Sequence, residues 1–243
     1  MEKIVVKYTK NQITRSGIMT FPRARKGVRK IFAAELITLF VGLATGFLSI
    51  FFESEIRLLP QAIEGLTKGG SLEMNGWIVL IIAGVAVVLS LFAALINLIG
   101  YIQASRDETS FLGALIFMLL NAVLSGFATY FQQSNEVFAG AFTISASIAE
   151  LFMIILTVKG LVNLSYNLNS RKMVARGNVL LRLIAVICLL SVVAEIVVFL
   201  FRLNVFVTSL LFAVLITNLV LSLVYYIIYL IYLSSCCAML SER

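Results

Sequence analysis

Long apolar runs separated by short polar segments make up most of this 243-residue chain. The first run, residues 31–52, contains 22 residues and one charge, Glu35. At about 1.5 Å per residue, a helix of this length crosses a hydrocarbon core of about 30 Å. The run therefore predicts a first transmembrane helix, preceded by a strongly basic flank that holds its start in the cytoplasm.

Five more apolar runs follow, and each is long enough to cross a bilayer. Together they predict an all-α integral membrane protein, a bundle of six transmembrane helices. The longest connection after the N-terminus, residues 53–76, contains Pro60 and a Gly-Gly pair and is expected on the outer side. The predicted spans are about 31–52, 77–102, 111–131, 137–158, 183–201 and 205–233.

Basic residues fix the expected orientation of these spans. If both termini, the 103–110 turn and the 159–182 loop are cytoplasmic, 16 of the 19 Lys and Arg residues lie inside. We therefore predict that the N- and C-termini are cytoplasmic. The predicted domains are a basic N-terminal arm (1–30), a transmembrane domain (31–235) and a short cytoplasmic tail (236–243).

Composition excludes a soluble globular domain, because 61% of the residues are apolar, 13% are charged and the mean hydropathy is +1.05. The expected partner is the lipid bilayer, and the expected location is a cell membrane, as a multi-pass protein of a bacterial plasma membrane. The net charge of +7 does not predict nucleic-acid binding, since the cations gather at helix ends.

Metal and cofactor chemistry is not expected. The chain has no His, and its cysteines are Cys188 and the adjacent pair Cys236 and Cys237. Such a set does not resemble a zinc, haem or iron–sulfur ligand pattern. We therefore predict no metal, no cofactor and no disulfide framework.

Small residues recur every four positions in the first span, at Ala34, Thr38, Gly42 and Gly46. This spacing places them on one helix face, where another backbone can approach closely. The face is a predicted helix-packing site. Sequence spacing leaves open whether it packs within one chain, in a homo-oligomer or against a protein partner.

Polar side chains inside the apolar runs form a candidate intramembrane site. An ionised carboxylate at the bilayer centre costs at least about 2.5–3.5 kcal/mol, so such residues usually have a role. By helical rise, the two acids of the set differ in depth by little more than one turn. Three interpretations stay open: a cation- or proton-linked site, a protonated and hydrogen-bonded structural cluster, and a mixed case in which one acid is structural and the other functional. The candidates are Asn121, Ser147, Glu150, Glu195 and Asn218.

Enzymatic activity is not expected, because His is absent and the sole Asp, Asp107, lies in a turn. We predict a non-enzymatic membrane subunit or scaffold that docks a partner through its basic arm and the 159–182 loop. The alternative is a small permease or channel built around Glu150 and Glu195. Both prolines lie outside the spans, so no span has the proline break common in secondary transporters.

Overall fold

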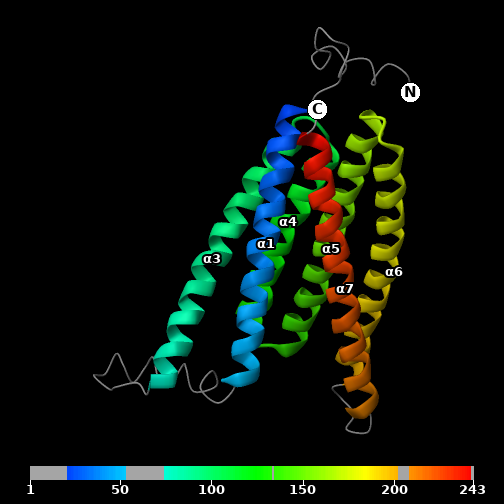
Figure 1. Ribbon diagram of the computed structural model, residues 1–243. Coiled ribbons are helices and arrows are strands. Elements are labelled where there is room, and N and C mark those ends of the chain that lie inside the picture. The colour runs from blue at the N-terminus through cyan, green and yellow to red at the C-terminus, as the bar shows by residue number, and fades with distance from the viewer. Residues whose placement is uncertain (1–20, 53–73, 133, 202–207, 242–243) are drawn as a thin grey trace. The chain divides into compact units, whose positions relative to one another are not determined.

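A computed structural model describes residues 21–52, 74–132, 134–201 and 208–241. Every regular element within these ranges is an α-helix (Figure 1). The all-α prediction is therefore confirmed for the described part of the chain. The helices are α1 (Pro22–Phe51), α3 (Met74–Ala104), α4 (Ser110–Phe131), α5 (Glu136–Asn167), α6 (Arg171–Phe201) and α7 (Thr208–Ser241).

Five stretches of these helices are long and apolar enough to cross a membrane. Their surfaces carry many exposed apolar side chains, among them Phe40 (68% exposed), Val88 (65%) and Leu91 (63%). Such surfaces are compatible with a membrane location, where lipid takes the place of water. The five stretches are Pro22–Leu48, Gly76–Ala104, Ser110–Phe131, Val137–Asn167 and Leu223–Ser241.

The helices extend past several of the predicted boundaries. Helix α1 begins at Pro22, inside the predicted basic arm, and α7 continues to Ser241, through most of the predicted tail. Proline fits the first helical turn because its missing N–H would have no partner there. Hydropathy marks where a chain leaves the hydrocarbon, whereas Lys and Arg remain good helix formers beyond that point.

The predicted 159–182 loop is instead two helix ends joined by a short turn. Helix α5 ends in a Schellman motif, in which the Asn169 N–H donates to the Tyr166 carbonyl (2.8 Å) and the Ser170 N–H to the Ser165 carbonyl (2.9 Å). Asn169 has a φ of 56°, a left-handed conformation that Asn tolerates better than most residues. Helix α6 starts directly afterwards, at Arg171.

The described chain divides into two compact units. The first contains the described residues of 21–29 and 100–241, and the second contains those of 30–52 and 74–99. In the second unit, the buried residues of α3 are Val79, Ala86 and Ala93, which are seven positions apart. Such spacing gives α3 one narrow packing face, as in a coiled coil.

Within the first unit, α4 packs against α5, α5 against α6, and α6 against α7. Its most completely buried side chains concentrate where α4 begins, α5 ends and α7 ends. The largest are Tyr101, Phe111, Leu161, Leu164, Ile184, Tyr229 and Leu233. The core of this unit therefore lies at the same end as most of its charged residues.

Candidate functional site

The predicted polar site lies on four helices of the first unit. On α4, Asn121 is half-buried and its Oδ1 accepts a hydrogen bond from the Ser125 hydroxyl (3.2 Å). On α5, Ser147 is half-buried and Glu150 is exposed. The side chains of Glu195 on α6 and Asn218 on α7 lie outside the described part, so a shared site remains a prediction.

The predicted packing face of α1 is buried at one of its four positions. Ala34 is fully buried, and its carbonyl accepts the Thr38 hydroxyl (3.0 Å). Thr38, Gly42 and Gly46 are exposed, and a Cβ added at either glycine meets no atom within 4 Å. An interface at these positions therefore also remains a prediction.

A second candidate site is the charged end of the first unit, which includes part of the basic arm and the 159–182 segment through which docking is predicted. We call it the basic end and define it as residues 21–29, 100–111, 157–182 and 229–241. Tertiary hydrogen bonds and close glycine contacts join its segments, which are far apart in the sequence. Four features make these connections.

The first is a helix cap supplied from a distant turn. One carboxylate oxygen of Asp107, in the turn between α3 and α4, accepts the backbone N–H groups of Arg23 (3.0 Å) and Ala24 (2.7 Å). The first amides of a helix have no partner inside the helix, and its N-terminus attracts negative charge. Asp107 therefore caps α1 from 83 and 84 residues away.

The second feature engages the other acid of the same turn. Glu108 Oε1 accepts hydrogen bonds from the Ser110 hydroxyl (2.9 Å) and the Asn163 side-chain amide (3.0 Å). Ser110 begins α4 and Asn163 lies near the end of α5. Glu108 therefore joins the start of one helix to the end of the next.

The third feature is a set of hydroxyl contacts between helices. Tyr101 and Thr157, both fully buried, share a hydrogen bond of 2.9 Å between their hydroxyl oxygens. The Tyr232 hydroxyl donates to the Met173 carbonyl (3.4 Å), which links α7 to α6. In a lipid environment such polar contacts contribute more to helix association than apolar contact alone, since lipid competes for the latter.

The fourth feature is close approach at three glycines. A Cβ added at Gly27 would lie 2.5 Å from the Gly100 carbonyl oxygen and 2.6 Å from the Ala104 nitrogen, both backbone atoms. A Cβ at Gly160 would lie 2.9 Å from the Phe111 ring, and one at Gly177 would collide with Tyr232 and Val162. Only glycine fits these contacts without a shift of the neighbouring atoms.

Cations dominate the accessible charge of the basic end. Its two acids are the half-buried Asp107 and Glu108, whose carboxylates already accept the hydrogen bonds described above. Of its ten cations, Arg25 is half-buried and the other nine are exposed. This end therefore offers positive charge on a packed, hydrogen-bonded base. The ten are Arg23, Arg25, Lys26, Arg29, Arg106, Lys159, Arg171, Lys172, Arg176 and Arg182.

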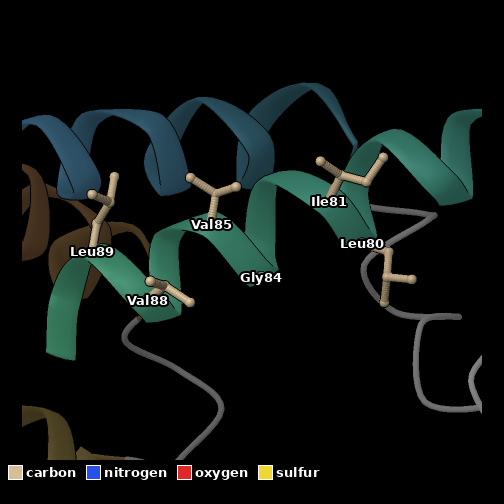
Figure 2. Close-up of a pocket in the computed structure, with 6 residues that line it drawn as sticks. All are labelled: Leu80, Ile81, Gly84, Val85, Val88 and Leu89. Atoms are coloured by element: carbon tan, nitrogen blue, oxygen red, sulfur yellow. The ribbon is translucent and has the colours of Figure 1, made fainter. Parts of the chain in front are cut away.

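An apolar hollow on α3, in the second unit, carries no comparable chemistry. Its volume is about 470 Å³, and all six of its lining residues lie on this one helix (Figure 2). Gly84 contributes no side chain, and the others are Leu, Ile or Val. The hollow is a notch in an apolar helix surface and lacks groups that would orient a polar ligand.

Comparison with protein-family models, curated proteins and solved structures gave no match to this chain. Its class therefore rests on the fold itself. The described part of the chain is all-helical, and five stretches of its helices are compatible with a membrane-spanning location.

Sequence reasoning located the cations of the basic end but not the contacts that organise it. Asp107 was assigned only to a turn, and Tyr101 and Thr157 lie within apolar runs. One usable signal was present, because a lone Asp in a short turn is a good capping acceptor. Its partner, the start of α1, is a tertiary neighbour that sequence spacing does not reveal.

Proposed function

We propose that this chain is a non-enzymatic, multi-pass membrane subunit or scaffold that docks a protein partner through its basic end. In this proposal the chain crosses a bacterial plasma membrane six times and both termini are cytoplasmic. The observation that carries it is the excess of exposed cations over acids that are already hydrogen-bonded.

The packing beneath these cations supports a docking role. Asp107 and Glu108 connect the first turn of α1, the start of α4 and the end of α5, and the Arg25 guanidinium donates to the Ser241 hydroxyl (3.0 Å) at the end of α7. A charged surface on a rigid base loses little conformational entropy when a partner binds. An acidic surface on a protein partner complements it and speeds association.

The test is co-purification from mild detergent after charge neutralisation. A triple variant, Arg23→Gln, Lys26→Gln and Arg106→Gln, removes three exposed cations of the basic end. We expect a specific partner to co-purify with the unchanged chain but not with the variant. Added salt should weaken the binding of this partner to the unchanged chain, because salt screens the charges. The matched control neutralises Arg57, Lys68 and Arg202, which the charge pattern places on the opposite side, and should retain the partner.

Purification of the unchanged chain without a partner, or equal loss of the partner from the control variant, would contradict docking at this end. Tags on both termini test the topology. Labelling of the two tags from opposite sides of the membrane would contradict cytoplasmic placement of both termini.

The alternative function, a small permease or channel, has one supporting observation, the exposure of Glu150 on a candidate membrane-spanning stretch. Ion or solute flux in proteoliposomes that Glu150→Gln abolishes would favour that alternative.

A further inference from the structure

A groove of about 550 Å³ lies at the turn between α5 and α6, in the first unit. Its polar lining comes from Tyr166, Asn169, Ser170, Arg171 and Asn178. The groove therefore offers a guanidinium, two side-chain amides and two hydroxyls. These are donors suited to phosphate oxygens, and Arg binds phosphate especially well because its guanidinium can donate two parallel hydrogen bonds.

The electrostatic surroundings of the groove are positive. No Asp or Glu occurs in the sequence from Lys159 to Arg182. Lys172 and Arg176 are exposed on the first turns of α6, close in sequence to Arg171. The groove consequently favours a ligand with net negative charge over a zwitterionic one.

An apolar surface continues from the groove along α6. Val174 and Ala175 complete the groove lining. On the same helix face, spaced by three or four residues, Val179 (66% exposed), Leu183 (37%), Val186 (59%) and Leu190 (47%) follow. Because this spacing keeps them in line with the groove, they form an apolar stripe leading away from its polar groups.

Two further side chains fit the polarity gradient of a membrane interface. Tyr166 is 73% exposed at the groove, where an aromatic ring with a polar tip suits the headgroup level of a bilayer. Arg182 is exposed on the same face as the apolar stripe, and its long side chain can reach back toward the headgroups. A soluble anion matches the groove alone, whereas an amphiphile matches the groove and the stripe together.

We propose that the α5–α6 groove binds the headgroup of an anionic phospholipid, with the acyl chain lying along the Val179–Leu190 face of α6. The phosphate lies against Arg171 and Asn178, and the headgroup fills the space beside Tyr166. This site requires a membrane location but does not depend on the docking of a protein partner. It gives the chain a preference for one lipid class.

The experiment uses the purified full chain in an uncharged detergent. Native mass spectrometry follows binding of phosphatidylglycerol and, separately, of phosphatidylcholine with the same acyl chains. We expect saturable binding of phosphatidylglycerol, strengthening with acyl-chain length, and weaker binding of phosphatidylcholine. The variant Arg171→Gln should bind phosphatidylglycerol about tenfold more weakly, the effect of losing one charge-assisted contact.

The matched control is Arg106→Gln, which removes an equally charged, exposed residue that does not line the groove. It should bind phosphatidylglycerol like the unchanged chain. Arg171→Lys, which keeps the charge, should retain intermediate binding, and it keeps the test decisive if Arg171→Gln does not fold. Unchanged melting temperatures exclude a folding defect.

Three outcomes would overturn the lipid site. Equal binding of the two lipids would remove the charge preference, and an equal loss in Arg106→Gln would make the attraction nonspecific. Displacement of the lipid by inorganic phosphate at equal concentration would define a soluble-anion site instead. The two proposals can fail separately. The docking variant tests partner binding and the Arg171 variants test lipid binding. If the docking variant loses its partner but still binds the lipid, both proposals are supported.

Discussion

The basic end and the opposite half of the α4–α5 hairpin share helices α4 and α5 but are held together by different contacts. At the basic end, buried hydroxyls, capping carboxylates and tight glycines join α1, α3, α4 and α5. In the opposite half, aromatic rings join α4 to α5, as in the stacked pairs Phe127–Phe142 (5.4 Å between centroids) and Phe131–Phe142 (5.6 Å).

This difference follows from the solvent that each half is expected to meet. Inside a bilayer, apolar contacts between helices gain little over contacts with lipid, so association there depends on van der Waals packing and stacking. Near the interface, charged and polar groups stay hydrated on one side while directing hydrogen bonds inward. Directional hydrogen bonds therefore fix the helix positions at the basic end, whereas the stacked rings of the aromatic half tolerate small shifts between the helices.

The largest expected effect comes from filling a tight contact at the basic end. Gly27→Ala places a methyl group against backbone atoms of Gly100 and Ala104, which cannot rotate away. We expect a loss of about 3 kcal/mol in the free energy of unfolding, typical of severe overpacking. The measurement is the melting temperature in detergent, followed by size-exclusion chromatography after heating.

The matched control for Gly27→Ala lies in the aromatic half. A Cβ at Gly126 meets no atom within 4 Å. Gly126→Ala should therefore be neutral, or stabilising by up to about 1 kcal/mol through helix propensity. Equal tolerance of the two substitutions would show that the basic end is less tightly packed than the glycine contacts indicate.

An intermediate effect is expected at the remote cap. Asp107→Ala leaves the Arg23 and Ala24 amides without their acceptor and should cost about 1–2 kcal/mol, whereas Asp107→Asn keeps an acceptor and should cost less. Hydrogen exchange at the first turn of α1 and the melting temperature are measured for both variants. If Asn proves as damaging as Ala, the charge of Asp107 matters more than its geometry.

The smallest effect is expected in the aromatic half. Phe142→Leu keeps most of the apolar area and loses the stacking on Phe127 and Phe131. Because Phe142 is only half-buried, we expect a total loss of about 0.5–1 kcal/mol, at the low end of the range for aromatic pairs. The melting temperature should fall slightly, and less than for Asp107→Ala. A control, Phe40→Leu, alters a ring that is 68% exposed and should change stability by no more than about 0.5 kcal/mol. If Phe142→Leu lowered the free energy of unfolding more than Gly27→Ala, contacts in the aromatic half would contribute more to stability than those of the basic end, contrary to our expectation.

The lengths of the apolar runs by themselves determined the helical class and the approximate position of most helices. The polar interruptions located the turn at 105–109 and the one at Ser134 and Asn135, because Ser, Asp and Asn separate the apolar runs there. Asn135 illustrates the local chemistry, since its side chain accepts the Val137 and Phe138 amides (3.1 and 3.2 Å) and begins α5. Such signals are readable because both partners lie within a few residues.

Helix ends beyond the apolar runs and the organisation of the basic end were decided by tertiary structure. Residues 159–167 and 171–182 looked like a loop because they are polar, yet their backbones continue two helices around a Schellman turn. The partners of Asp107 and Tyr101 lie 56 to 84 residues away. A sequence records which groups can donate or accept, but only the packed chain brings a donor and an acceptor from distant segments to within 3 Å of one another.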